Sequence, residues 1–360
     1  MKKFVKTFGF IIVLLCIFNV FTSDINSYTG IDLPSYSSEV VLDVKTNRVL
    51  YGQNIHLKRY PASTTKILTA LCVINSVSLD DVVEVGADTV GVEGSSIYLQ
   101  VGESLTVREL LYGLMLRSGN DCAETLAKYC SGSIKDFARL MNETARNIGA
   151  TESNFINPHG LHDDNHYTTA YDLALITSCA LKNESFREIV ATKSVDISAP
   201  TGKRHLINKN KMLNRLDGCT GVKTGFTKKA GRCLVTSCKR DDVEFVSVVL
   251  NCAPMWEETE KLLNTAFNEY HPCKIVNKNE ILDFIENDFT DEKIGVYAKN
   301  DVILALKESE INLLTLAIEN AHESKPIKKD DLVAYLNIYC ANKLIFTEKL
   351  YSIYNVLNQK

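Results

Sequence analysis

Three short motifs along this 360-residue chain contain the side chains that a serine acyl-transfer reaction needs. They are Ser63-Thr64-Thr65-Lys66, Ser118-Gly119-Asn120 and Lys223-Thr224-Gly225. A serine needs a neighbouring base, and a lysine three residues later can serve if burial or a nearby cation lowers its pKa. Each motif alone is common. All three in this order predict a nucleophile, an amine base, a second hydroxyl and a cationic substrate clamp.

The first motif is predicted at the start of a helix. Pro61 suits a first helical turn, and the apolar residues between positions 67 and 74 recur with a helical period. Ser63 and Lys66 would share one face of this helix, and free N–H groups at its start would favour a developing oxyanion. Lys223 is a candidate for the cation that lowers the Lys66 pKa. Taken alone, the motif also fits an ordinary helix start with a surface serine and lysine.

The second motif interrupts a long helical pattern. Thr106 and Glu109 form a predicted capping box, and apolar residues then recur at helical spacing from 107 to 114 and from 123 to 130. The break at 118–120 presents two polar side chains from a fixed loop. An ordinary helix–helix turn contains the same residue types, so this motif alone decides little.

The third motif is predicted on a strand that follows Gly218 and Gly221. Residues 233–238 and 243–251 form two further predicted strands, joined by a polar turn at 239–242. A lysine and a hydroxyl at neighbouring strand positions, with a glycine that permits close approach, suit a peptide carboxylate. The alternative is an edge strand with a solvated lysine, which weakens when all three motifs are counted.

In these motifs and in longer stretches, the chain resembles the low-molecular-mass penicillin-binding proteins, which are serine D-alanyl-D-alanine carboxypeptidases of peptidase family S11. The similarity extends from about residue 41 to residue 270, two thirds of the chain. It implies an α+β fold with a β-lactamase/transpeptidase-like catalytic domain, in which helices surround an antiparallel sheet. The stretches that carry the resemblance are 42–51, 60–66, 102–106, 116–121, 157–161, 167–170 and 221–225.

The resemblance implies a role for each reacting group. Ser63 is expected to attack the carbonyl between the last two D-alanines of a peptidoglycan stem peptide and to form an acyl-enzyme. Lys66 is expected to accept the serine proton, and Ser118 to relay a proton towards the leaving amine. Water then releases the shortened peptide. β-Lactams are expected to be trapped at Ser63, because they mimic the acyl-D-Ala-D-Ala unit.

The resemblance also implies how the substrate is held. Asn120 is expected to hold Lys66 and the substrate backbone, and Lys223-Thr224-Gly225 to bind the terminal carboxylate. Backbone N–H groups of Ser63 and Phe226 are expected to form the oxyanion hole, so the Phe226 side chain matters little there. No metal or organic cofactor is expected.

Three other functions are weighed against this one. Class A β-lactamases share the motifs but deacylate with a glutamate and an asparagine four positions apart. Here Glu152 has Ile156 at that spacing, which favours a peptidase. A DD-endopeptidase acting on cross-links, and a penicillin-binding sensor or scaffold with little turnover, remain open alternatives.

A cluster of histidines is a weaker candidate for a metal site. His159, His162, Asp163 and His166 lie within eight positions, and such residues ligate zinc. A loop that contains glycine does not guarantee the ligand geometry of a zinc site. We expect a polar loop beside the active site, with Thr169 and Asp172 capping the next helix.

The N-terminus indicates export. Lys2, Lys3 and Lys6 precede an apolar stretch at 8–21, which is short for a membrane span and is typical of a signal peptide at 1–23. The cleavage site is not clean, so an uncleaved anchor remains open. We expect an extracytoplasmic location, at the cell wall or the outer face of the cytoplasmic membrane.

Charge and the C-terminal sequence limit the other partners. The formal net charge is −4, and loss of the signal lysines makes it more negative, so nucleic acid is not an expected ligand. Many relatives end in an amphipathic anchoring helix, whereas the residues at 357–360 show none. Membrane association is therefore expected only through the N-terminal segment. The oligomeric state is left open.

Cysteine usage is ambiguous. The chain has 11 cysteines, of which Cys16 lies in the signal segment, and no C-x-x-C spacing occurs. An exported protein often contains disulfides. Most of these cysteines lie in apolar periodic segments, where cysteine behaves as a small hydrophobe, so we expect free buried thiols.

Length and pattern predict two domains after the signal segment. The catalytic domain is expected at 30–270 and ends in a helix at 257–270. Short apolar runs separated by turn-like residues then predict a small β-sandwich or barrel at 273–360, whose simplest role is that of a spacer. The predicted strands are 274–276, 281–285, 293–297, 302–306, 311–317, 332–338 and 343–351.

Overall fold

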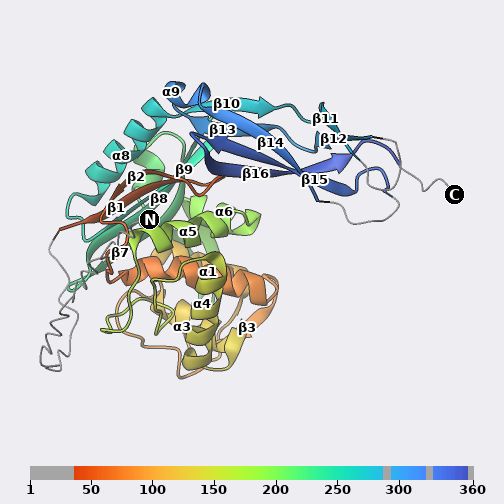
Figure 1. Ribbon diagram of the computed structural model, residues 1–360. Coiled ribbons are helices and arrows are strands. Elements are labelled where there is room, and N and C mark those ends of the chain that lie inside the picture. Colours follow the sequence, from red (N-terminus) through yellow and green to blue (C-terminus); the bar gives the residue numbers. More distant parts are fainter. Residues whose placement is uncertain (1–35, 287–292, 322–326, 356–360) are drawn as a thin grey trace, which may run out of the picture. The chain divides into compact units, whose positions relative to one another are not determined.

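The computed structural model describes residues 36–286, 293–321 and 327–355, which belong to one compact unit spanning residues 33–360 (Figure 1). The predicted signal segment at 1–23 and the C-terminal residues 357–360 lie outside the described ranges. Within those ranges, no helix combines the length and apolar character needed to cross a membrane.

A five-stranded antiparallel sheet organises the first two thirds of the chain. Its strand order is β2-β1-β9-β8-β7, so the first strand pairs with a strand that follows it by about 200 residues. The predicted strands at 233–238 and 243–251 are confirmed, and the third motif lies on the edge strand β7. The strands are β1 Ser38–Asp43, β2 Val49–Gln53, β7 Cys219–Thr227, β8 Gly231–Arg240 and β9 Val243–Leu250.

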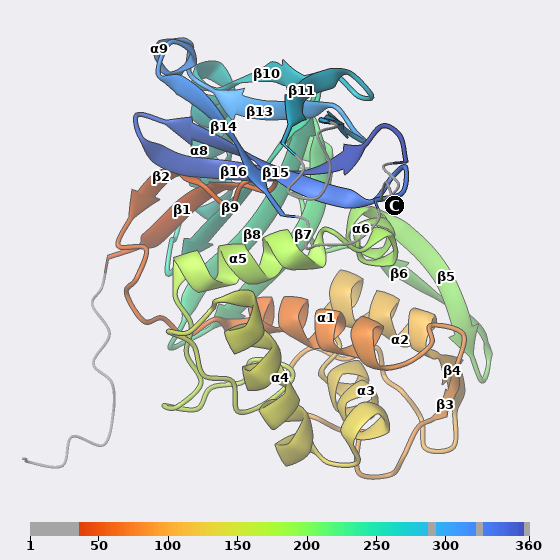
Figure 2. The ribbon, with the colours of Figure 1, turned by 45° about the vertical axis from the view of Figure 1, so that its right-hand side comes forward.

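Helices cover both faces of this sheet because its strands are apolar on both sides. Val40 belongs to the core that includes residues of α1 (Lys66–Ser76) and α5 (Ala170–Ala180). The next residue, Val41, belongs to a second core with residues of α8 (Met255–Glu269). Successive residues of a strand point to opposite faces, so the sheet separates two cores. Figures 1 and 2 show α1 and α5 on one side of the sheet and α8 on the other.

Further helices pack around α1 and flank the second motif. Helix α2 (Val107–Tyr112) runs into a π-helical turn, Gly113–Arg117, and two residues separate that turn from α3 (Asn120–Ser131). The predicted break between two helices is therefore confirmed. The remaining helices of this region are α4 Ile134–Ile148, α6 Glu184–Ala191 and the short α7 Met212–Arg215.

Two predicted helix caps are confirmed. At the start of α2, Thr106 Oγ1 accepts a hydrogen bond from the Glu109 N–H, and the Glu109 carboxylate accepts one from the Thr106 N–H. At the start of α5, Thr169 Oγ1 accepts from the Asp172 N–H. Each cap satisfies backbone donors that the first helical turn leaves unpaired.

Two small two-stranded sheets were not predicted from the sequence. Strands β3 (Val82–Glu84) and β4 (Ser104–Thr106) pair beside α2. Strands β5 (Ser194–Ala199) and β6 (Gly202–Ile207) form a hairpin with mostly exposed residues. Because so few of these side chains are buried, the apolar periodicity that marks other strands is weak here.

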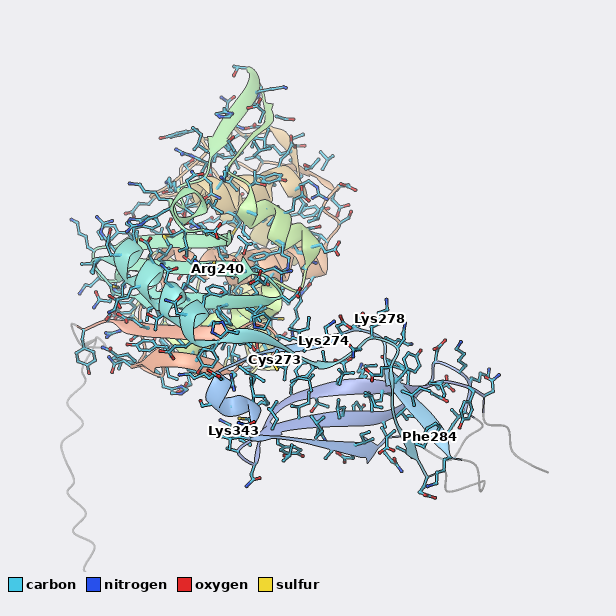
Figure 3. The ribbon with its side chains drawn as sticks, turned by 90° about the horizontal axis from the view of Figure 1, so that it is seen from above. Arg240, Cys273, Lys274, Lys278, Phe284 and Lys343 are labelled. Carbon is cyan, nitrogen blue, oxygen red and sulfur yellow. The ribbon has the colours of Figure 1, made fainter. Side chains whose placement is uncertain are left out.

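The C-terminal region is β-rich, as predicted. Strands β10 and β13 form a two-stranded ribbon, and five strands form a sheet in the order β11-β12-β16-β15-β14. Both contribute to one apolar core that includes Val276, Leu304 and Leu350. Figure 3 shows Cys273 and Lys274 on β10, Phe284 on β11 and Lys343 at the start of β16. The strands are β10 His271–Val276, β11 Ile281–Ile285, β12 Ile294–Ala298, β13 Val302–Leu306, β14 Leu314–Asn320, β15 Leu332–Cys340 and β16 Lys343–Ser352.

One predicted strand in this region was partly wrong. The run at 311–317 was expected to be extended, but it begins at the end of a short helix, α9 (Glu308–Ile311), and the strand starts only at Leu314. The Lys307 N–H donates to the Glu310 carboxylate, a local capping bond that favours the helical turn.

Candidate active site

The first motif lies on a tight turn that leads into α1. Residues Ala62–Thr65 form a 3₁₀ turn rather than the regular helix that the sequence predicted, and Lys66 is the first residue of α1. Ala62 adopts a positive φ of 49°, an uncommon conformation for a residue with a side chain. Such strain is held only where the surrounding structure determines it, and Ala62 directly precedes Ser63.

Two glycines allow other segments to approach this turn. A Cβ on Gly160 would lie 1.8 Å from the Ala62 carbonyl oxygen, and Gly160 itself has a φ of 84°. A Cβ on Gly225 would lie 3.1 Å from the Ser63 nitrogen. The glycine of the third motif therefore lets the backbone of β7 lie directly beside the N–H of Ser63.

Lys66 is completely buried and bonded to three oxygens. Its Nζ lies 3.1 Å from Ser63 Oγ, 2.7 Å from Asn120 Oδ1 and 2.8 Å from the His159 carbonyl oxygen. Burial, and after it the charge of Lys223, holds the pKa of Lys66 well below its usual value. The predicted effect of Lys223 is thus present, but burial is the larger cause.

These contacts orient the lone pair of the amine. A neutral amine has two N–H groups and one lone pair. A carbonyl oxygen and an amide oxygen can only accept, so the two N–H groups are committed to Asn120 Oδ1 and the His159 oxygen. The lone pair that remains is directed at the Ser63 hydroxyl, which is the arrangement that removes a serine proton.

Asn120 is itself fixed in orientation. Its Nδ2 donates to the Glu93 carbonyl oxygen at 2.5 Å, and its backbone N–H donates to the Ser95 oxygen at 2.7 Å. A Cβ on Gly94 would lie 2.8 Å from Asn120 Nδ2. The loop at 93–95 thus holds the amide with its oxygen towards Lys66. Sequence reasoning did not find this loop, because nothing local to it resembles a catalytic motif.

Ser118 lines the same pocket as Ser63, the candidate nucleophile. It adopts a left-handed conformation, with φ 65° and ψ 34°, directly after the π-helical turn. Its side chain is 4% exposed, and its hydroxyl has no hydrogen-bond partner within the described part of the chain. A buried hydroxyl without a protein partner is available to a bound substrate.

Lys223 is buried beneath the surface of β7. It is 1% exposed, and its Nζ donates to the Thr224 carbonyl oxygen at 3.0 Å. Burial, and after it the nearby charge of Lys209, lowers the pKa of Lys223 to about 7. At neutral pH the amine is therefore only partly protonated.

The motifs meet at a pocket of about 290 Å³. Ser63, Ser118, Thr224, Gly225 and Phe226 of the predicted site line it, and Phe226 exposes 63% of its surface there. The three buried members, Lys66, Asn120 and Lys223, lie behind this lining. Five further lining residues were not predicted, namely Ser95, Lys209, Arg232, Met255 and Trp256. Arg232 could have been predicted from the pairing of the two strands, because it lies directly opposite Phe226. We see no sequence signal for the other four.

The histidines of the weighed metal cluster have separate partners. His159 Nε2 lies 3.4 Å from the Glu124 carboxylate, and His162 Nε2 lies 3.3 Å from the Asp164 carboxylate. His166 is bonded to Thr65. Among the described residues, no group of three or more His, Cys, Asp or Glu side chains has the geometry to hold a metal ion.

Glu152 lies outside the pocket. Its carboxylate pairs with His56 Nδ1 at 2.6 Å, and both side chains are exposed. It is therefore not placed to activate a water against an acyl-enzyme at Ser63, in agreement with the sequence argument against a β-lactamase.

Comparisons with known families cover most of the chain. Residues 32–253 match the family described as D-alanyl-D-alanine carboxypeptidase, peptidase S11. Residues 270–356 match the C-terminal domain of penicillin-binding protein 5.

Individual relatives agree with these matches. The chain is 32% identical over 308 residues to the D-alanyl-D-alanine carboxypeptidase DacF of Bacillus subtilis, covering 82% of this chain and 77% of that one. It superposes on the crystal structure of DacD from Francisella tularensis with a TM-score of 0.66 at 26% identity, covering 91% and 94% of the two chains. Penicillin-binding protein 5 of Haemophilus influenzae has the same fold, with a TM-score of 0.72 at 24% identity over 91% and 99%.

Proposed function

The chain belongs to the peptidase S11 family and is a serine-type D-alanyl-D-alanine carboxypeptidase; on that premise we propose that Ser63 is the nucleophile and the pentapeptide stem of peptidoglycan the substrate. The observation that carries the assignment is the bonding of Lys66. Its two N–H groups are taken by acceptor-only oxygens, which leaves the lone pair for the Ser63 hydroxyl.

Acylation follows from this arrangement. Ser63 Oγ attacks the carbonyl carbon of the penultimate D-alanine, and the serine proton passes to Lys66 Nζ. The N–H groups of Ser63 and Phe226 stabilise the oxyanion. When the C–N bond breaks, Lys66 returns the proton to the leaving amine through the Ser118 hydroxyl, and D-alanine departs.

Deacylation uses the same groups. A water molecule attacks the ester carbonyl while Lys66, neutral again, accepts the proton of the water. The proton then passes to Ser63 Oγ as the ester bond breaks, which releases the shortened peptide and restores the enzyme. No other base is needed, because Lys66 regains its lone pair in each half of the cycle.

Substrate binding uses the remaining motif residues. Asn120 holds the substrate backbone as well as Lys66, and Lys223 and Thr224 bind the C-terminal carboxylate, with Gly225 permitting the approach. β-Lactams occupy the same positions and acylate Ser63. This explains why the relatives bear the name penicillin-binding protein.

We further propose the location and the division of the chain. The enzyme acts outside the cytoplasm, directed there by a signal segment at 1–23 that is cleaved or retained as an anchor. The catalytic domain spans 30–270 and the β-rich domain 273–360. The separate family matches at 32–253 and 270–356 support this division.

D-Alanine release by purified residues 24–360 from a muramyl-pentapeptide tests the function. Release that accumulates the tetrapeptide in the wild type, and that Ser63→Ala abolishes, is the expected result. Fluorescent penicillin labels the wild type and not the variant, whose unfolding temperature is unchanged. Stoichiometric labelling without release would instead favour the sensor or the endopeptidase, and cross-linked dimer substrates would separate those two. Retained labelling of Ser63→Ala would overturn the nucleophile assignment.

A further inference from the structure

We propose that Arg232 supplies the permanent positive charge that binds the C-terminal carboxylate of the departing residue. The inference rests on the proposed function and adds a residue to it: neither the motifs nor the family matches assign Arg232 a role.

The hairpin places Arg232 at the pocket. Phe226 of β7 pairs directly with Arg232 of β8, and Thr224 pairs with Leu234. Side chains alternate along a strand and directly paired residues share a face, so Thr224, Phe226 and Arg232 lie on one face of the sheet. Leu234 belongs to the core under α8, which identifies that face as the one towards Met255 and Trp256.

Arg232 is available to a ligand. Its side chain is exposed, and it lines the same pocket as Ser63 and Thr224. Within the described ranges its guanidinium makes no hydrogen bond or ion pair, and its Cζ lies 5.8 Å from the centroid of the Phe226 ring. A cation–π contact of this kind leaves the N–H groups of the guanidinium available to a carboxylate.

The other cations of the site are less suited to this role. Lys223 is buried, donates to the Thr224 oxygen, and has a pKa lowered to about 7. Lys209 Nζ donates to Ser95 Oγ at 3.0 Å, and burial lowers its pKa as well. An arginine remains protonated at all physiological pH values and matches a carboxylate with two parallel N–H groups.

A second pocket meets the first at Arg232. This pocket of about 550 Å³ shares Phe226 and Arg232 with the active site and is also lined by Glu39 and Glu258. The carboxylates of Glu39 and Glu258 disfavour the binding of a further carboxylate in this second pocket. The carboxylate is therefore confined to the side of Arg232 that faces Thr224 and Ser63, where the scissile bond lies.

The test compares two substrates and two variants. The substrates are an N-acylated L-Lys-D-Ala-D-Ala peptide and the same peptide with its C-terminal carboxylate converted to an amide. The variants are Arg232→Gln and, as the matched control, Lys229→Gln, which removes one charge from the exposed β7–β8 turn outside the pocket.

We expect Arg232→Gln to lower kcat/KM for the free acid by about 10- to 100-fold, mainly through KM, since hydrogen bonds to charged groups are worth this much. The value for the amide should change less than about threefold. Lys229→Gln should leave both unchanged, and Arg232→Lys should restore part of the loss, because it returns the charge without the planar fork.

A pH series gives a second readout. In Arg232→Gln the remaining preference for the acid over the amide should decline between pH 6 and 8.5, because Lys223, with a pKa of about 7, loses its charge there. The wild type should keep its preference over this range.

Each outcome has a distinct meaning. An equal loss on acid and amide, or no loss beyond that of Lys229→Gln, overturns the role of Arg232 while leaving the carboxypeptidase intact. A wild type without serine-dependent D-alanine release overturns the proposed function itself. A circular dichroism spectrum and unfolding temperature matching the wild type exclude misfolding of Arg232→Gln; if they differ, Arg232→Lys decides the question.

Discussion

His166 supports the turn that carries Ser63, the proposed nucleophile, through a hydrogen bond to Thr65, with 2.9 Å between His166 Nε2 and Thr65 Oγ1. The Ile156 N–H donates to His166 Nδ1 at 3.1 Å, so Nδ1 is unprotonated and Nε2 carries the hydrogen. The Thr65 hydroxyl in turn donates to the Ala62 oxygen at 2.9 Å. A neutral imidazole therefore connects the loop at 156–166 to the residue before Ser63.

This bond predicts an acid-labile fold. Burial, and after it the charge of His159, lowers the pKa of His166 to about 3 from 6.5. Above pH 6.5 the ring is neutral in both the folded and unfolded chain. As the pH falls from 6.5 towards 3, only the unfolded chain takes up the proton, so stability is lost over that window.

The loss should amount to roughly 3 kcal/mol between pH 7 and pH 4.5, at about 1.4 kcal/mol per unit. Urea unfolding of the wild type and His166→Gln at both pH values measures it, and the variant should lose less stability on acidification. His205→Gln, on the exposed β5–β6 hairpin, is the control. Equal slopes for the wild type and His166→Gln would contradict the assignment.

Removal of the amine should slow acylation without preventing binding. Lys66→Ala is expected to fold and to bind penicillin, but to acylate about 10²- to 10⁴-fold more slowly, the usual contribution of a general base. Stopped-flow measurement of covalent penicillin labelling gives the rate, and dialysis distinguishes bound from covalent ligand. A rate within tenfold of the wild type would assign the base to another group.

Alanine substitutions at Gly160 and Gly132 distinguish the effect of backbone strain from the effect of a steric clash. Both have a positive φ, of 84° and 75°, but a Cβ on Gly160 would meet the Ala62 oxygen at 1.8 Å, whereas a Cβ on Gly132 meets nothing within 4 Å. Gly132→Ala should cost about 1 kcal/mol of stability and leave kcat/KM unchanged. Gly160→Ala should cost more and lower kcat/KM at least tenfold, because the Ser63 turn must move. Thermal unfolding and D-alanine release measure the two effects; similar results for both variants would show that the turn tolerates the collision.

The cysteines should be unpaired. All ten cysteines of the described ranges are free thiols, and burial raises the pKa of Cys72 to about 12 and that of Cys233 to about 11. Thiol titration of residues 24–360 without reductant should therefore give few reactive groups in the native protein and about ten in guanidinium. A count lower by two would reveal a disulfide.

Local sequence patterns predicted the parts of the site that lie on regular elements. The apolar run after Ser63, the capping box at Thr106 and Glu109, and the strand of Lys223 all depend on interactions within a few residues. Such interactions leave a periodicity in the sequence. The thiol state was also predicted, because the cysteines occupy apolar positions.

The residues that were missed depend on contacts between distant segments. The missed loop at 93–95 acts on Asn120, which follows it by about 25 residues, and Arg232 reaches the pocket because β7 and β8 pair in one register. The helix α9 occupies the start of a predicted strand, where Glu310 pairs with Arg48, 262 residues away, at 2.9 Å. No pattern local to these residues records such contacts.

Trp256 is the only tryptophan in the chain, and it lines the active-site pocket. Indole emission depends on the polarity around the ring and is distinct from that of the 15 tyrosines. The tryptophan emission of this enzyme therefore comes from a single position in the wall of the active-site pocket. It provides an unlabelled optical signal for following occupancy and turnover in real time, on natural peptides as well as on antibiotics.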